Sequence, residues 1–470
     1  MDLLSPLDAR YRNELKGYHE VASEEAFITY RAKVELLYLE FLIDKLSSIG
    51  LVKPINDEER WRLRGVRLSD GDVNEVRRLE DELGHDVKAI EYVLRGKLKA
   101  IGLEHYAHLI HLGLTSEDVN NLAMGIMLKR MLYEYLIPSL VDLGRVLVAL
   151  INKYADTPMI ARTHGQPATP TTFGKEMAYH AYRLCSWISS LINLKINGKV
   201  AGASGSMASF TMIAQLDWPR ELMNFVSSLN LEPTPVSTQI LPPDNLTHIL
   251  AMVSLTSYSL INLAQDVWMY SMLGYIRFKG KAIGSSTMPH KVNPVDLENA
   301  EGNLKLGSSI LMEVSKILQL SRLQRDLSDS TIKRNLGLAI GYVILGLRRL
   351  RKFMEGIEVN EDALINDLNN HWEVLSEAVQ VRLRALGQAD AYEKSLRLFR
   401  VPRMSMNDYL NAIKELGVND ELLLNLRPGN YVGYAGVIAR NIAESCTKLL
   451  NKAEEACIKE REAMSMLGFR

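Results

Sequence analysis

The stretch DNLTHILAMVSLTSYSLINLAQDVWMYSML, residues 244–273, decides the fold class. No Asp, Glu, Lys or Arg lies between Leu246 and Ala264, and the apolar residues point in several directions around a helix. The stretch also carries polar groups such as Thr247, Ser257 and Asn262, which make it too polar for a helix that faces lipid. We therefore predict a helix in the centre of a bundle and not a membrane span.

Four more segments, 116–154, 171–195, 294–320 and 331–353, have the same helical spacing of apolar residues. They predict an all-α protein with an elongated bundle, roughly 35 to 55 Å long at about 1.5 Å rise per residue. We predict an N-terminal helical domain over 1–104, a central long-helix bundle over 105–355 and a C-terminal helical domain over 356–470. The wide apolar faces of the central helices can be covered by another subunit or by the chain itself, and the sequence does not decide between these two interpretations.

The composition is that of a soluble globular protein of 470 residues, with 47% hydrophobic and 24% charged residues. The formal charge of −1 gives no overall attraction to nucleic acid or to an anionic membrane, so an anion site must come from local clusters of basic residues. Three cysteines without metal-ligand spacing, and an N-terminus without a basic segment and apolar run, favour a cytoplasmic location.

A polar loop, GSSTMPHKVNP at 284–294, interrupts the helical pattern. It holds three adjacent hydroxyls, an imidazole, an ammonium and a carboxamide. Gly284 gives the backbone freedom while Pro289 and Pro294 restrict it, as a catalytic lid requires. An ordinary polar connection between helices is the alternative interpretation.

Four other polar clusters are candidates for a site: RTHGQPATP at 162–170 before a long helix, HLGLTSEDVNN at 111–121 at a helix start, GHDV at 84–87, and SRLQRDLSDSTIKRN at 321–335 between two long helices. His164 is well placed as an acid or base, and N–H groups at the second cluster can hold an anion. The four cations of the last cluster suit a phosphate or a dicarboxylate. Each cluster also has a purely structural interpretation. His164 can be a lone loop histidine, the cluster at 111–121 can serve only as a helix cap, and 84–87 can be a polar turn. The cluster at 321–335 can be a turn whose cations are neutralised by Asp326 and Asp329.

Other kinds of site lack their sequence patterns. His105, His108 and His111 wind about 120° around a helix and have no cysteine or helical His-Glu pair beside them, so we expect no metal site. No P-loop and no dinucleotide fingerprint is present, and we expect no cofactor. A nucleophilic Ser-His-Asp enzyme built on Ser285 would lack its G-x-S-x-G turn.

Taken together, the clusters resemble the fumarase/aspartase superfamily. The loop at 284–294 resembles its signature loop, 163–166 its second characteristic region and 113–118 its first, in the same order. Within the superfamily the chain is most similar to the adenylosuccinate lyase family, on the His290-Lys291 form of the loop, SPLDARY at 5–11, and the segments 321–327 and 329–335. The similarity covers nearly the whole chain and is thinnest after about residue 385.

The resemblance implies a homotetramer built on a shared helical core, with each active site formed by three subunits. The implied reaction is elimination of fumarate from adenylosuccinate, leaving AMP, and from succinyl-aminoimidazole carboxamide ribotide in purine biosynthesis. By analogy Ser285 is the general base and His164 the general acid, while His85 and His111 support the substrate phosphate and the acid. The substrate-binding residues implied by analogy are Arg10, Tyr11, Asp86, Thr115, Ser116, Gln239, Asn293, Asn299, Arg325, Ser330, Thr331 and Arg334, with Gln239 resting on the weaker motif STQI at 237–240.

These residue types suit the implied reaction. A proton next to a carboxylate is very weakly acidic, so the charge that develops there needs fixed cations and hydrogen-bond donors. Lys291 and Asn293, six and eight residues beyond Ser285, can supply them on the closing loop. A serine becomes a base only when closure removes water and nearby cations favour the alkoxide. Protonation by His164 assists departure of the exocyclic nitrogen.

Other lyases of the superfamily are the main alternative. Fumarase and aspartase typically carry glycine at the position of His290, and argininosuccinate lyase carries glutamine. Their substrates lack a nucleotide phosphate, which leaves the basic cluster at 322–334 without a purpose. A cycloisomerase and a non-enzymatic structural derivative are further alternatives, and the choice between Ser285 and Ser286 as base rests on analogy alone.

Overall fold

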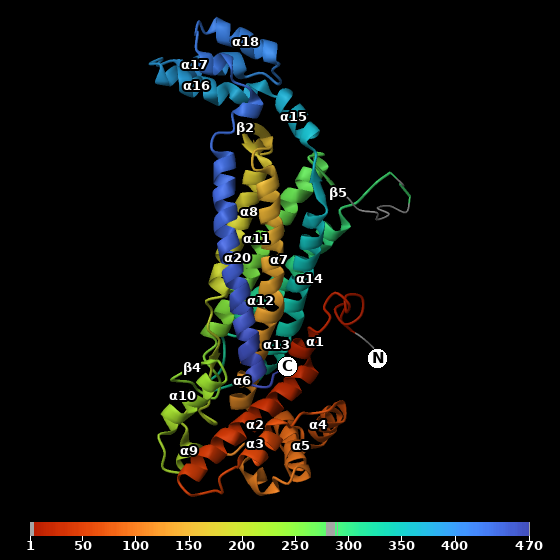
Figure 1. Cartoon of the computed structure of the whole chain (residues 1–470), viewed down its shortest axis with the longest axis vertical. Helices are drawn as coiled ribbons and strands as arrows, with labels where there is room; N and C mark the ends of the chain where they lie inside the picture. Colours follow the sequence, from red (N-terminus) through yellow and green to blue (C-terminus); the bar gives the residue numbers. More distant parts are fainter. Residues whose placement is uncertain (1–3, 279–286, 289, 470) are drawn as a thin grey trace.

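The computed structural model describes residues 4–278, 287–288 and 290–469, and over these ranges the chain is an elongated all-α fold (Figure 1). The predicted base Ser285, with its neighbours Gly284 and Ser286 and with Pro289, lies outside the described residues. The predicted all-α fold class is confirmed, because the long segments identified in the sequence form helices and the strands of the described residues form only two-stranded ladders.

The N-terminal helices gather at one end of the bundle (Figure 1). Their bounds are α1 His19–Ala22, α2 Glu24–Ser48, α3 Asp57–Arg64, α4 Asp70–Leu83, α5 Asp86–Ala100 and the 3₁₀ helix η1 Glu104–Leu109. Ser23 caps α2 by accepting a hydrogen bond from the Ala26 amide, and α2 then packs against α5 and α6.

The central bundle consists of the helices whose apolar periodicity the sequence displays. Its elements are α6 Ser116–Arg130, the π-helix η2 Met131–Leu136, α7 Ile137–Tyr154, α8 Phe173–Leu191, α9 Ala208–Thr211, α10 Trp218–Ser228, α11 Asp244–Met272, α12 Val295–Ile317, α13 Ser328–Lys333 and α14 Leu336–Glu355. The predicted helix over 116–154 is interrupted only by the single π-helical segment η2. Within the described residues, α11 is the one helix long and apolar enough to cross a membrane, and most of its apolar window is buried inside the bundle.

Glycines let α12 and α14 approach closely, and α12 also packs against α11. A Cβ added to Gly307 would lie 2.8 Å from the backbone oxygen of Ala339, and one on Gly346 would lie 3.0 Å from that of Ala300. Any larger side chain at these points would separate the two helices. The same helices carry the polar cluster 321–335 at their junction, so their spacing also sets the position of that cluster.

Three short ladders complete the fold: β1 Pro158–Thr163 with β2 Gln166–Thr172, β3 Asn197–Gly198 with β4 Glu232–Pro233, and β5 Ile276–Phe278 with β6 Ile357–Val359. The first corrects one expectation, since 162–170 is not a simple loop before a helix. Thr163 pairs with Gln166 across a two-residue turn, in which His164 and Gly165 have φ of 54° and 74°. Positive φ at both residues matches the twist of the flanking strands and makes a tight hairpin.

The C-terminal part has a small core of its own around Trp372, Leu383 and Tyr409. Its elements are α15 Glu361–Asn369, η3 Trp372–Leu375, α16 Ser376–Ala385, α17 Ala391–Phe399, α18 Met406–Glu415, α19 Glu421–Leu424 and η4 Pro428–Asn430. The last helix, α20 Ala435–Met466, then returns along the bundle and packs against α7 and α8 (Figure 1). The division at residues 104 and 355 stays a prediction.

Candidate active site

Polar side chains from distant parts of the sequence meet between the N-terminal ends of α5 and α6 and the short helix α13. His85 is the N-cap of α5, and its Nδ1 accepts a hydrogen bond from the Lys88 amide at 3.1 Å. In the neutral imidazole this leaves the proton on Nε2, which lies 3.5 Å from the Ser116 hydroxyl. His85 therefore presents a donor beside the start of α6.

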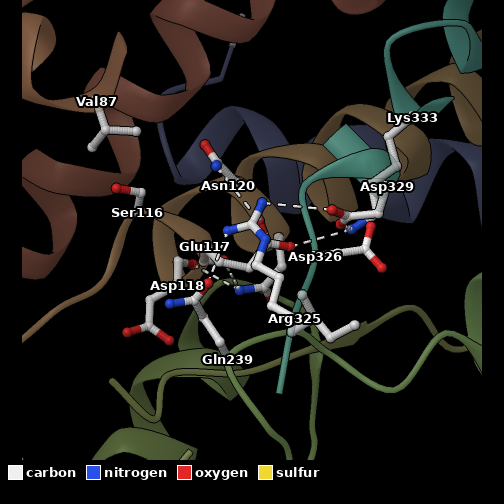
Figure 2. Close-up of polar contacts among 12 residues, drawn as sticks. Val87, Ser116, Glu117, Asp118, Asn120, Gln239, Arg325, Asp326, Asp329 and Lys333 are labelled. Carbon is white, nitrogen blue, oxygen red and sulfur yellow. Dashed lines mark hydrogen bonds and ion pairs between the residues drawn. The ribbon is translucent and has the colours of Figure 1, made fainter. Parts of the chain in front are cut away.

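Glu117 links α6 to α13 in the centre of this cluster, as Figure 2 shows. Its carboxylate lies 3.2 Å from Lys333 Nζ and 3.4 Å from Arg325 Nη2, and Glu117 is 3% exposed. Asp329 lies 2.6 Å from Lys333 Nζ and 3.6 Å from Arg325 Nη2. Burial acts to lower the pKa of Lys333, but the carboxylates of Glu117 and Asp329 raise it above its ordinary value.

Arg325 also connects this cluster to the segment before α11. Its Nη1 donates to Gln239 Oε1 at 3.2 Å (Figure 2). Gln239 Nε2 in turn donates to the Ala203 carbonyl at 3.1 Å. Arg325 Nε and Asp329 Oδ1 are buried and have no hydrogen-bond partner within the described part of the chain. A buried donor and a buried acceptor left unsatisfied are expected where a ligand completes the network.

Asp86, at the first position of α5, joins the cluster to α2. It forms ion pairs with the buried Arg31 and, at 3.5 Å, with Arg334, which also pairs with Glu24. Burial acts to raise the pKa of Asp86, but Arg31 lowers it below the ordinary value. The cations and carboxylates of the whole cluster are equal in number: Arg31, Arg325, Lys333 and Arg334 against Glu24, Asp86, Glu117 and Asp329.

Asp118 holds the first turn of α6 in place through hydrogen bonds to neighbouring backbone amides and to Lys199. It is completely buried and accepts from Lys199 Nζ at 2.7 Å and from the backbone amides of Ala201, Gly202 and Thr115 at 2.9 to 3.0 Å. Thr115 and Ser116 are thus held by a buried, saturated carboxylate and not by capping alone.

His111 lies in the turn before α6 with a positive φ of 60°. Its Nδ1 is 2.5 Å from the Glu35 carboxylate on α2. Burial acts to lower the pKa of His111, yet the hydrogen bond and the charge of Glu35 raise it above its ordinary value. The imidazole is therefore oriented by Glu35 through Nδ1, so that Nε2 is the nitrogen available for a ligand.

A cavity of about 70 Å³ adjoins the cluster. Its apolar wall comes from Phe27, Met124, Leu128, Ile240, Leu246 and Leu318, and its polar wall includes Asp86, Glu117, Ser330, Lys333 and Arg334. An apolar space with a few convergent polar groups is the usual form of a small-molecule site. Thr331, a predicted substrate-binding residue that follows Ser330 on α13, is exposed and does not line this cavity.

His164 does not join this cluster within one chain. It is exposed at the tip of the β1–β2 hairpin, which lies toward the opposite end of the bundle from α5 and α13 (Figure 1). Arg162 anchors the hairpin: its guanidinium donates to the Tyr275 hydroxyl at 3.0 Å and pairs with Asp367 of α15 at 2.8 Å. Tyr275 also donates to Asp367, so β1, the start of β5 and α15 are tied together.

The remaining predicted residues that the structure describes form a third group around the start of α12. Asn299, in the first turns of α12, donates to the Tyr11 hydroxyl at 3.2 Å, and Arg10 is exposed beside Tyr11. Lys291 is exposed, and Asn293 is half-buried just before α12. The described candidate residues thus fall into three separate groups: the α5–α6–α13 cluster, the hairpin, and the start of α12 with the segment around Tyr11.

Sequence reasoning missed several members of the cluster. Glu117, Lys333 and Asp329 stand inside two of the quoted motifs, so their charge and spacing could have identified them. Arg31 and Glu35 could not be found in this way, because their partners are 55 and 76 residues away and α2 carries no local motif. Among the described residues, no group of three or more His, Cys, Asp or Glu side chains is arranged to hold a metal ion.

With this geometry in place, the comparisons with known proteins become informative. Residues 64–307 match a family profile described as lyase, and residues 321–432 match one described as adenylosuccinate lyase C-terminal. The protein named adenylosuccinate lyase from Escherichia coli K12 is 37% identical over 444 residues, covering 92% of this chain and 96% of that protein. The protein of the same name from Legionella pneumophila strain Corby is 36% identical over 444 residues, covering 93% and 97%.

Two solved structures share the fold. A fumarate lyase from Mesorhizobium sp. BNC1 superposes with a TM-score of 0.70 at 19% identity, over 91% of this chain and 97% of that one. A 3-carboxy-cis,cis-muconate lactonizing enzyme from Pseudomonas putida has the same TM-score at 22% identity, over 89% and 95%. At these identities the likeness concerns the fold alone.

Proposed function

The chain belongs to the adenylosuccinate lyase family of the fumarase/aspartase superfamily, and from this premise we propose that it is a C–N lyase that eliminates fumarate from adenylosuccinate to leave AMP. It acts in the same way on succinyl-aminoimidazole carboxamide ribotide in purine biosynthesis. The observation that carries the proposal is the match of both the lyase profile and the C-terminal adenylosuccinate lyase profile in one chain, with relatives of that name aligned almost end to end.

We propose that Ser285 removes the proton next to the carboxylate and that His164 protonates the departing nitrogen. Lys291 and Asn293 stabilise the charge that develops on the substrate carboxylate. His85 donates from Nε2 to the substrate phosphate, and His111, held by Glu35, supports the acid. The remaining predicted residues bind the substrate, with Gln239 and Arg325 acting as a hydrogen-bonded pair.

The charge balance of the α5–α6–α13 cluster supports a site completed by groups from outside it. Four cations face four carboxylates there, so little net positive charge is left to bind the phosphate and two carboxylates of adenylosuccinate. Further cations have to come from Arg10 and Lys291, or from another subunit. The separation of the His164 hairpin from the cluster within one chain supports the same conclusion (Figure 1).

We propose a homotetramer with composite active sites, built on the central helices. Large apolar side chains are exposed along these helices, including Tyr182 on α8, Tyr258 and Met272 on α11, Leu306 on α12 and Val437 on α20. Exposed apolar surface on neighbouring long helices is typical of a subunit interface. We further propose a cytoplasmic location and the three-domain division 1–104, 105–355 and 356–470, in which α20 returns to the central bundle.

One assay tests the proposed reaction. The purified protein is incubated with adenylosuccinate, argininosuccinate and malate in parallel, and the change in absorbance of each reaction mixture is followed as the products form. We expect turnover of adenylosuccinate alone. Turnover of argininosuccinate or malate without turnover of adenylosuccinate would assign the chain to another activity of the superfamily.

Variants test the proposed roles. His164→Ala and Ser285→Ala should abolish turnover while substrate still binds, and His108→Ala, an exposed histidine elsewhere, should leave turnover unchanged. If Ser286→Ala were inactive while Ser285→Ala kept a normal kcat, the base would be Ser286.

A further inference from the structure

A second polar cavity lies on the far side of α2 from the candidate active site. Its volume is about 150 Å³, and it opens between α2, the segment 66–68, the end of α6 and the C-terminal residues Gly468 and Phe469. Its lining residues are Thr29, Tyr30, Ala32, Lys33, Leu36, Val66, Arg67, Leu68, Arg130, Gly468 and Phe469. Three of them are cationic and none carries a carboxylate, which is the composition of an anion site.

Lys33 is the unusual member of this lining. It is 8% exposed, and within the described chain its ammonium has no hydrogen-bond or ion-pair partner. Burial, with the nearby charge of Arg67, lowers the pKa of Lys33 to about 8. The ammonium lines the cavity and has no charged partner within 4 Å in the described chain, so an anion that enters the cavity could pair with it directly.

Arg67 points to the same place as Lys33. A Cβ built on Gly468 would lie 3.0 Å from Lys33 Nζ and 3.1 Å from Arg67 Nη2, so the two donors converge over the bare Cα of this glycine. Gly468 has a φ of +81° after the end of α20, a conformation that favours glycine. The missing side chain keeps the space in front of both donors open.

Arg130, the third cation, is already neutralised. Its guanidinium makes two hydrogen bonds to Glu134 and a third to the Tyr30 hydroxyl. The stacking of Phe469 on Tyr30, with ring centroids 5.0 Å apart, closes the apolar side of the cavity. Lys33 and Arg67 therefore provide its net positive charge.

We propose that this cavity is a second ligand site, distinct from the active site, that binds a small oxyanion such as phosphate or a dicarboxylate between Lys33 and Arg67. The site shares α2 with the active site. Arg31 and Glu35, one helical turn apart, contact Asp86 and His111 from one face, and Lys33 points away from that face. An anion here would therefore bind one helix away from the groups that orient the proposed catalytic residues.

Binding is tested by calorimetric titration of inorganic phosphate and, separately, of fumarate into the full-length His164→Ala variant with its active sites saturated by adenylosuccinate, so that neither anion can enter them. We expect saturable binding that weakens at least about tenfold in Lys33→Met and in Arg67→Gln, because each variant removes a charge-assisted hydrogen bond. Lys459→Met, an exposed lysine on α20, controls for net charge and should bind as the unmodified chain does. The ratio of the phosphate and fumarate affinities identifies the preferred anion.

Stability gives a second readout that guards against misfolding. In anion-free buffer Lys33→Met should raise the Tm, because a buried methionine costs less than a buried ammonium, and phosphate should then add no further stabilisation. Turnover of adenylosuccinate should be unchanged. In crystals soaked in selenate, the anomalous peak should lie within about 3.2 Å of Lys33 Nζ and Arg67 Nη2 and be absent from Lys33→Met.

Three results would overturn the proposal. They are phosphate and fumarate affinities that both variants leave unchanged, a selenate peak only at other positions, and phosphate binding that appears only when the C-terminal carboxylate is converted to an amide. The last would assign the cavity to a carboxylate of the chain itself.

Discussion

Asp118 illustrates how one residue positions a candidate site without touching a ligand. Its carboxylate is completely buried and saturated by Lys199 and by the amides of Ala201, Gly202 and Thr115. In Asp118→Asn the charge of Lys199, itself 1% exposed, loses its partner in the interior. We expect a loss of about 3–5 kcal/mol in the free energy of unfolding, measured by denaturant titration.

A double-mutant cycle separates this loss from a simple packing defect. Lys199→Met removes the unpaired charge, so Asp118→Asn with Lys199→Met should be more stable than Asp118→Asn alone. Asp326→Asn is the matched control, because Asp326 accepts hydrogen bonds from Ser328 in an exposed turn, and its loss should cost far less than that of Asp118. Equal losses for both single variants would remove the special role given to Asp118.

His111 and Glu35 predict a pH dependence of stability. The pKa of His111 is raised in the folded state, so the protonated imidazole stabilises the fold. This contribution is complete below the unfolded pKa of about 6.5 and is lost as pH rises through the folded pKa. The Tm of the native chain, measured from pH 5.5 to 9, should therefore fall relative to that of Glu35→Gln as pH rises.

The size of the effect is about 1.5 kcal/mol, the contribution of a charge-assisted hydrogen bond. His105→Gln, which removes an exposed histidine in the same region, should leave the pH profile of the native chain unchanged. A constant difference between the native chain and Glu35→Gln across this pH range would show that His111 is not charged in the folded state.

At the scale of elements, apolar periodicity was sufficient to predict five long helical segments, including α11 as a core helix and α12 and α14 on either side of the basic cluster, but α2 and α20 were not predicted as long helices. The β1–β2 hairpin was not predicted, because its turn is His164-Gly165 and lacks the Asn-Gly or Asp-Gly pair that usually marks a two-residue hairpin. The motifs located most of the candidate site. The contributions of α2 depend on contacts across 55 and 76 residues, which no local pattern contains.

The anchor of the hairpin yields a prediction about catalysis. Arg162→Ala removes the contacts to Tyr275 and Asp367 that hold the hairpin close to its turn, while His164 itself is untouched. Because small displacements of a catalytic group are costly, kcat should fall about tenfold to a hundredfold with a smaller change in KM. Steady-state kinetics with adenylosuccinate measures both.

Arg440→Ala provides the matched control for Arg162→Ala. Arg440 pairs with Asp156, just before β1, at 2.7 Å, but both side chains are exposed, so kcat should stay within about twofold. Arg162→Lys should recover part of kcat through one of the two contacts. A rise in KM with unchanged kcat in Arg162→Ala would instead make Arg162 a substrate-binding residue.

The close approach of α12 and α14 predicts a packing effect. In Gly307→Ala the new methyl group would collide with the Ala339 carbonyl and the Val343 side chain, both 2.8 Å from the added Cβ. The helices must separate, and we expect a loss of about 1–3 kcal/mol in thermal or denaturant unfolding. Gly96→Ala in α5 meets no atom within 4 Å and should stabilise by up to ~1 kcal/mol. Equal effects would mean that the bundle tolerates a wider spacing.

At the scale of the whole molecule, one chain presents the parts of the proposed site but does not assemble them. The α5–α6–α13 cluster is neutral in sum, the hairpin with His164 lies toward the other end of the bundle, and Lys291 and Asn293 stand beside the start of α12 (Figure 1). An elongated bundle separates these groups because helices of 20 to 29 residues lie between them. Antiparallel association of such bundles would bring the hairpin of one chain to the cluster of another.

Subunit mixing tests this arrangement directly. His164→Ala and Ser285→Ala are each expected to be inactive, but in the proposed tetramer a mixture of the two would contain some sites in which the intact histidine and the intact serine come from different subunits. Mixing the two variants, with subunit exchange verified by native mass spectrometry, should therefore restore a fraction of native turnover. Mixing His164→Ala with a second preparation of the same variant should restore none. If proven hybrids of the two variants stayed inactive, both residues would have to act from one chain. The hairpin and the cluster, which are far apart within one subunit, would then have to be brought together by a rearrangement of that subunit and not by assembly between subunits.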